Sequence, residues 1–152
     1  MYKLYLEENI SSKKLLEKVL LEENITSYNI IYNKNGKPYI KNNPLYFNIS
    51  HNKSTTALVI SDKEAGVDLQ YLTFRKAVVD RFFTKGEQEI IEKSNNKEYD
   101  FTKIWIMKEA FVKMKGTGIT YGLEKVDTTK LKKKIDIIDK GAYLIAICRS
   151  EE

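Results

Sequence analysis

The stretch IWIMKEAFVKMKG, from Ile104 to Gly116, places charged side chains inside an apolar helical pattern. Four residues recur at helical spacing and predict one apolar seam: Ile104, Met107, Phe111 and Met114. Lys108, Glu109 and Lys113 lie among them, although burying an ion is costly unless a counter-charge or a metal compensates it. Because little of the circumference is polar, we expect this helix to be mostly covered, with Glu109 facing a cleft.

Before this helix, the sequence predicts mostly strands. Strands are expected at 2–6, 45–50, 55–61 and 65–72. Ser11 and Ser12 offer N-caps to a helix over 12–24, and Asn35-Gly36 between two apolar runs is a strong hairpin signal.

From Arg75 onward the apolar period becomes helical. Helices are expected at 75–83 and 84–93, followed by a polar loop at 94–100. Thr84 and Glu87 have the spacing of a capping box, so we favour a capping role for Glu87. The segment 132–149 is expected to be a hairpin with its turn at 139–141. The whole pattern predicts an α+β fold of two packed halves, 1–65 and 66–152, in a single domain.

The composition bounds the class of protein. The chain has 152 residues, of which 42% are hydrophobic and 31% charged, as in soluble globular domains. No apolar run reaches the roughly 20 residues that a membrane helix needs, so we expect no membrane partner. The first residues show no basic region followed by an apolar stretch, which favours a cytoplasmic location.

Two residue counts restrict the chemistry. Cys148 is the only cysteine and His51 the only histidine, which excludes a disulfide within the chain, a thiolate cluster and a multi-histidine zinc site. Any metal would therefore be held by oxygen ligands, which favours magnesium, manganese or calcium.

The formal net charge of +5 indicates an anionic partner or a solvated lysine-rich surface. One hypothesis from this charge is a small nucleic-acid-binding module. It predicts exposed lysines interleaved with aromatic residues, whereas Lys108 and Lys113 accompany a glutamate that would repel phosphates unless a cation intervened.

Two acids could hold such a cation. Asp68 lies among apolar strand residues and Glu109 on the helix, and together they could bind a magnesium ion that also grips a polyphosphate. The alternatives are a strand-end acid in water and an ordinary surface ion pair between Glu109 and Lys113. Ser50 and His51, at the end of a strand, could hydrogen-bond a phosphate.

Five motifs together resemble a known family. They are GKPYI (36–40), FNISH (47–51), GVDLQ (66–70), FFTKGE (82–87) and WIMKEAFVKMKG (105–116). Their order and spacing are similar to those of 4′-phosphopantetheinyl transferases of the surfactin-synthetase-activating type.

The resemblance implies a fold and an activity. Two similar halves would be related by a pseudo-twofold, with coenzyme A bound between them. The reaction would move phosphopantetheine from coenzyme A to a serine of an acyl or peptidyl carrier protein, with Mg²⁺, and release adenosine 3′,5′-bisphosphate. A degenerate relative that binds coenzyme A or carrier without turnover is the alternative.

The resemblance also assigns roles to residues. Asp68 and Glu109 would be the metal ligands, and Glu109 or a metal-bound water would take the serine proton. Lys108 and Lys113 would lie along the pyrophosphate, and Ser50 and His51 at a coenzyme A phosphate. The nucleotide end would be met by Lys37 and Lys13. Phe82, Phe83 and the residues after Gly116 are candidates for the carrier-docking surface.

This sequence departs from the family pattern at two places. Gln70 stands where many relatives have a third acidic metal ligand, so we expect it to contact the metal weakly or through water. Larger members also have more basic sequence before the first motif, which predicts a looser grip on the adenosine end here.

Overall fold

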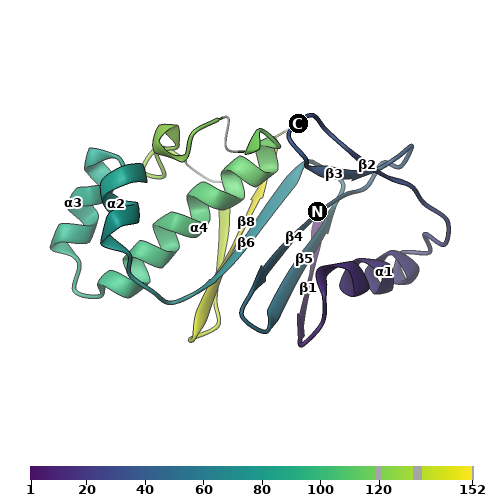
Figure 1. Cartoon of the computed structure of the whole chain (residues 1–152), viewed down its shortest axis with the longest axis horizontal. Helices are drawn as coiled ribbons and strands as arrows, with labels where there is room; N and C mark the ends of the chain where they lie inside the picture. Colours follow the sequence, from purple (N-terminus) through teal and green to yellow (C-terminus); the bar gives the residue numbers. More distant parts are fainter. Residues whose placement is uncertain (119–120, 132–134, 152) are drawn as a thin grey trace.

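Two three-stranded antiparallel sheets stand side by side at the centre of the molecule (Figure 1). The computed structural model describes residues 1–118, 121–131 and 135–151. The first sheet, in the order β1-β5-β4, contains β1 (Tyr2–Glu8), β4 (Tyr46–Asn52) and β5 (Thr55–Ser61). The second, in the order β6-β8-β7, contains β6 (Ala65–Tyr71), β7 (Ile135–Asp139) and β8 (Tyr143–Arg149).

Helices cover the outer face of each sheet. On the side of the first sheet lie α1 (Ser12–Glu22) and the small hairpin of β2 (Ile30–Tyr32) and β3 (Pro38–Ile40). On the side of the second lie α2 (Lys76–Phe82), α3 (Lys85–Lys93), α4 (Lys97–Lys115) and the 3₁₀ turn η2 (Leu123–Lys125). No helix in the described part of the chain is both long and apolar enough to cross a membrane.

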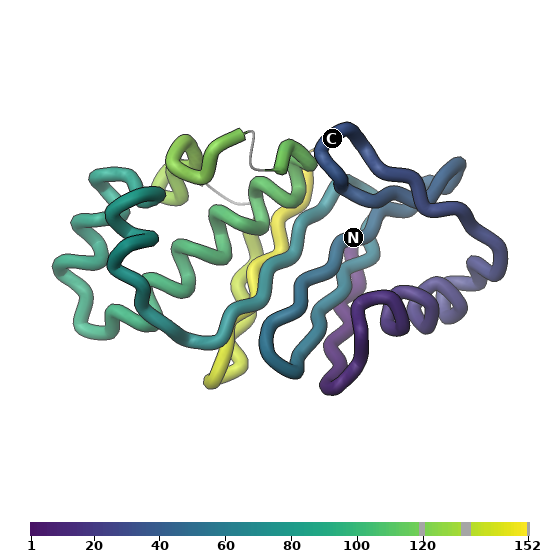
Figure 2. The backbone as a smooth tube through the Cα atoms, viewed as in Figure 1, coloured from purple at the N-terminus to yellow at the C-terminus, as the bar shows by residue number. Residues whose placement is uncertain are grey.

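Both sheets have the same connectivity. In each, the first strand pairs with the last, and the last pairs with the strand before it, always antiparallel. Figure 2 shows that residues up to about 60 form one side of the molecule and the later residues the other. The mixed α and β composition is thus confirmed, and the pseudo-twofold relation of the halves stays a prediction that this shared connectivity supports.

One hydrophobic core lies between the sheets. It consists of buried residues from β5, β6 and β8: Ala57, Val59, Ala65, Val67, Leu69, Ile145 and Ile147. Because α1 covers the other face of the first sheet, every residue of β5 is buried, including both threonines. A strand covered on both faces needs no polar alternation, and TTALVIS shows none.

Most local predictions are confirmed. Thr84 and Glu87 form the expected capping box, and Asn35-Gly36 lies in the turn between β2 and β3. The predicted loop at 94–100 is wrong in its second half, because α4 begins at Lys97 under an N-cap by the Asn96 side chain. Residues 132–134, expected in the last hairpin, lie outside the described residues.

A glycine allows α4 to pack against β6. A Cβ atom on Gly66 would lie 2.1 Å from the carbonyl oxygen of Ala110 and 2.4 Å from the amide nitrogen of Met114. Both are backbone atoms, so no side-chain rotation could relieve the clash. Gly66 therefore lets the helix carrying Glu109 approach the strand carrying Asp68.

We predict that Gly66→Ala destabilises the protein by about 1–3 kcal/mol or more, because α4 must move away from β6. Chemical denaturation measures the change. Gly86→Ala is the matched control, since its nearest neighbour would be a methyl carbon of Thr129 at 3.9 Å and alanine suits a helix. Equal stability of Gly66→Ala and wild type would contradict this packing.

Candidate active site

Side chains, instead of a backbone ladder, join the facing edges of the two sheets. Three alternate residues of β4 each accept a hydrogen bond from a backbone N–H of β6. The pairs are Asn48 Oδ1 with Val67 N at 2.9 Å, Ser50 Oγ with Leu69 N at 3.0 Å, and Asn52 Oδ1 with Tyr71 N at 3.0 Å. We call this line of contacts the seam.

The sequence pattern N-x-S-x-N at 48–52 accounts for the seam. Alternate residues of a strand point the same way, so three polar side chains of β4 meet one edge of β6. Ser50 also donates from its hydroxyl to Asp68 Oδ1 at 3.2 Å. Ser50 thus supports the Asp68 carboxylate, and sequence analysis missed the partner roles of Asn48 and Asn52.

Lys113 spans the seam from α4. Its ammonium donates to the carbonyl oxygen of Ile49 on β4 at 2.8 Å and to that of Val67 on β6 at 2.7 Å. Asp68 Oδ1 lies 3.9 Å from the same nitrogen. Burial lowers the pKa of Lys113, and the charges of Asp68 and Glu109 act against that shift.

The charges of Asp68, Glu109 and Lys113 influence one another's pKa values. Burial raises the pKa of Asp68 from 3.8 to about 7; Lys113 opposes the rise and the charge of Glu109 adds to it. Burial also raises the pKa of Glu109, against the effect of Lys113. The two carboxylates repel each other, and a divalent ion bound between them would relieve this repulsion.

A cavity of about 380 Å³ opens beside this cluster. Its walls come from the β2–β3 turn, β4, α4 and the segment after α4. They include Asn35, Lys37, Pro38, Asn48, Ile49, Glu109, Val112, Lys113, Gly116, Gly118 and Leu123. We call it the crevice; both sides of the molecule contribute to it.

A second cavity of about 400 Å³ shares Pro38 and Ile49 with the crevice. It extends to Ser12 and Lys13 at the start of α1. The two cavities therefore border the same two residues and together run from Glu109 toward Lys13.

The structure places Lys108 away from the crevice, contrary to its expected contact with phosphates. Its side chain is 0% exposed and donates to Glu87 Oε1 at 2.7 Å and to the carbonyl oxygen of Val126. The other carboxylate oxygen of Glu87 accepts from the backbone and hydroxyl of Thr128. Residues 108 and 109 are neighbours on a helix and point to different sides, so the motif acid faces the crevice and the motif lysine the core.

Two further predicted residues, His51 and Gln70, line neither the crevice nor the second cavity. His51 is exposed; its Nδ1 lies 2.7 Å from Thr56 Oγ1, whose own proton goes to the carbonyl oxygen of Ile10. His51 is therefore the donor at Nδ1, which leaves Nε2 as the ring atom for a ligand. Gln70 Nε2 donates to the carbonyl oxygen of Tyr71 at 3.3 Å.

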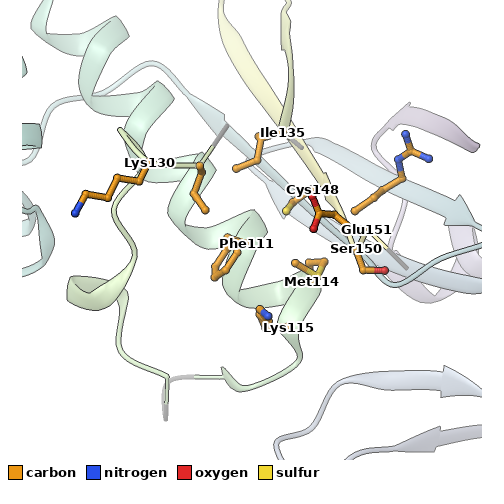
Figure 3. Close-up of a pocket in the computed structure, with 10 residues that line it drawn as sticks. Phe111, Met114, Lys115, Lys130, Ile135, Cys148, Ser150 and Glu151 are labelled. Atoms are coloured by element: carbon orange, nitrogen blue, oxygen red, sulfur yellow. The ribbon is translucent and has the colours of Figure 1, made fainter. Parts of the chain in front are cut away.

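A further cavity of about 440 Å³ lies on the other side of α4 (Figure 3). Phe111, Met114 and Ile135 supply apolar walls, and Lys130 extends away from the other labelled side chains. No predicted site residue lines it.

The carboxylates of Asp68 and Glu109 fit a magnesium ion. Asp68 and Glu109 offer hard carboxylate oxygens, and Mg²⁺ commonly uses one or two carboxylates with phosphate and water oxygens. No group of three or more potential ligands among His, Cys, Asp and Glu occurs in the described residues. The donor set thus suits a metal that a polyphosphate ligand helps to bind.

Comparisons with known proteins identify the family of the chain. Residues 64–150 match the family model of the 4′-phosphopantetheinyl transferase superfamily. The chain is 34% identical over 93 residues to the 4′-phosphopantetheinyl transferase psf-1 of Bacillus pumilus, covering 59% of this chain and 40% of that protein.

Other relatives carry the same description. The 4′-phosphopantetheinyl transferase AcpT of Salmonella typhi is 34% identical over 107 residues, which cover 66% of this chain and 55% of AcpT. The 4′-phosphopantetheinyl transferase gsp of Aneurinibacillus migulanus is 29% identical over 111 residues, which cover 69% of this chain and 46% of gsp. The chain spans about half the length of the curated relatives it matches.

We predict that replacing either partner of the buried Lys108–Glu87 pair costs about 3–5 kcal/mol, because the other charge stays buried and unpaired. Urea unfolding of Lys108→Met and Glu87→Gln measures this. The double variant should lose less stability than the sum of the losses in the two single variants. Unchanged stability of Lys108→Met would mean that the lysine faces the crevice after all.

Asp68 should make stability depend on pH. Its folded pKa of about 7 exceeds the unfolded value of 3.8, so the native state holds the proton more tightly. Stability due to this group is full below pH 4 and is lost as the pH rises through 7. Without divalent ions, the stability of Asp68→Asn relative to wild type should rise between pH 4 and 7 and level off above. If urea unfolding gave the same pH dependence of stability for Asp68→Asn and wild type, the raised pKa of Asp68 would be excluded.

Proposed function

The chain belongs to the 4′-phosphopantetheinyl transferase superfamily, and we propose that it transfers the 4′-phosphopantetheine arm of coenzyme A to a serine of a carrier protein. The observation that carries this proposal is the cluster of Asp68, Glu109 and Lys113 beside the crevice, of which Glu109 and Lys113 form part of the wall. Two carboxylates and an ammonium beside this cavity suit a bound pyrophosphate and its metal.

Coenzyme A would lie along the two adjoining cavities. The crevice would take the pyrophosphate near Lys113, and the cavity at Lys13 would take the adenosine end. The N-terminus of α1 and the free Nε2 of His51 are suited to a phosphate, the latter as a donor only when the imidazole is protonated.

In the proposed reaction, the carrier serine oxygen attacks the phosphorus that bears pantetheine. A bond forms from the serine oxygen to phosphorus, and the bond from phosphorus to the bridging oxygen of the pyrophosphate breaks. Adenosine 3′,5′-bisphosphate leaves with that oxygen. Asp68 and Glu109 would hold Mg²⁺, which neutralises charge on the pyrophosphate when bound.

The chain's own side chains would position the reacting groups and neutralise charge on the phosphates. Lys113 keeps one donor near Asp68 after serving two carbonyl oxygens, and this donor is available to a phosphate oxygen. Glu109 faces the crevice and would accept the serine proton; burial raises the pKa of its carboxyl group, which makes the carboxylate a stronger base. Ser50 and the seam hold the Asp68 carboxylate in place.

An acidic carrier helix is the proposed partner. Trp105, one helical turn before Glu109, contacts Phe82 with ring centres 5.9 Å apart, and the Arg81 guanidinium lies 4.9 Å from the Phe82 ring centre. This group of apolar and basic side chains, on a chain with a formal net charge of +5, suits an acidic partner surface. A nucleic-acid-binding role is less well supported, since Lys37 and Lys108 are buried and Lys113 is mostly so.

The test is to incubate the protein with apo carrier protein, coenzyme A and Mg²⁺ and to weigh the carrier. We expect the carrier to gain one phosphopantetheine arm. Asp68→Asn and Glu109→Gln should each lower the rate at least about 100-fold, because each removes charge that stabilises the transition state.

Glu92→Gln, at an exposed position on α3, is the control and should retain the wild-type rate. No transfer to carriers of the fatty-acid, polyketide or peptide type, by protein that binds coenzyme A, would favour the degenerate alternative. A full rate in Asp68→Asn would refute the proposed site.

A further inference from the structure

The ammonium of Lys37 is fully occupied by protein acceptors. It donates to Glu64 Oε2 at 2.7 Å and to the carbonyl oxygens of Ala65 and Met114, each at 3.0 Å. A lysine ammonium has three protons, so none is left for a ligand. The residue is 8% exposed and contributes to the wall of the crevice.

These acceptors belong to three separate parts of the fold. Lys37 itself lies at the end of the β2–β3 turn. Glu64 and Ala65 lie where the chain passes from the first sheet to the second, and Met114 lies in the last turn of α4. One ammonium thus joins the turn, the connection between the sheets and the helix that carries Glu109.

The same turn holds the carboxyl end of α4 by two further contacts. Asn33 Nδ2 and Asn35 Nδ2 donate to the carbonyl oxygen of Gly116 at 2.8 and 3.2 Å. Gly116 has φ of 67°, and a Cβ there would lie 2.9 Å from Asn33 Nδ2. The last carbonyl groups of a helix lack partners within it, and a cation there also offsets the helix dipole. The turn therefore caps α4 from the other sheet's side.

We propose that Lys37 is a positioning residue, which locks α4 to the β2–β3 turn and so sets the width of the crevice, and that its ammonium does not contact coenzyme A. The activity part of this inference rests on the proposed function. Lys37 acts through α4, because Glu109 and Lys113 lie on the two helical turns before the locked end. Glu64, which does not line the crevice, is the counter-charge that holds the ammonium there.

The experiment compares Lys37→Met, Glu64→Gln and the double variant. A positioning role predicts that each single variant lowers kcat about 10-fold or more, and that the double variant is no slower than Lys37→Met. The Kd of coenzyme A should keep the salt dependence of wild type, because no phosphate contact is lost. Lys34→Met, an exposed lysine of the same turn, is the control and should behave as wild type.

Hydrogen exchange of the amides at the end of α4 provides a readout that does not need activity. Exchange there should accelerate in Lys37→Met and Glu64→Gln and stay unchanged in Lys34→Met. If wild type modifies no carrier, the proposed function fails, and the exchange result still decides the role of Lys37.

A direct ligand role for Lys37 would give a different result. Lys37→Met would then weaken coenzyme A binding at least 10-fold with a shallower salt dependence, while Glu64→Gln would keep wild-type kcat and exchange. That outcome, or wild-type exchange in both single variants, would overturn the inference.

Discussion

One lysine ammonium joins the two strands on which the candidate active site is built. Lys113 reaches from α4 to a carbonyl oxygen of β4 and to one of β6, and Asp68 lies beside it. The two strands are joined along the seam by side-chain contacts and not by backbone pairing. The close approach of α4 at Gly66 is what brings Lys113 within reach.

The charges of the helix at 104–116 have three different environments. Lys108 pairs with Glu87 in the core, Glu109 faces the crevice, and Lys113 lies at the seam beside Asp68. Each buried ammonium, including that of Lys37, combines a carboxylate with at least one carbonyl oxygen. Such multiple acceptors compensate the loss of hydration that makes a buried ion costly.

Local patterns were sufficient to predict most elements, although not the start of α4, since capping boxes, turn dipeptides and alternation act within a few residues. The capping box of Thr84 and the turn at Asn35-Gly36 are examples. The candidate acids followed from their apolar surroundings and from the resemblance. The partners of the buried lysines could not be predicted in this way. Glu87 is 21 residues from Lys108 and Glu64 is 27 residues from Lys37, so only tertiary packing selects these pairs. The N-x-S-x-N alternation at 48–52 was visible in the sequence, but its role depends on which strand lies alongside.

The most direct test of the account is a crystal structure with coenzyme A and Mn²⁺, which accepts the same oxygen ligands as Mg²⁺ and is located by its anomalous scattering. The account predicts one strong anomalous peak within coordination distance of Asp68 and Glu109, touching the pyrophosphate, with the adenosine directed toward Lys13. A peak bound to other residues, or coenzyme A in place with no metal between the two acids, would contradict it.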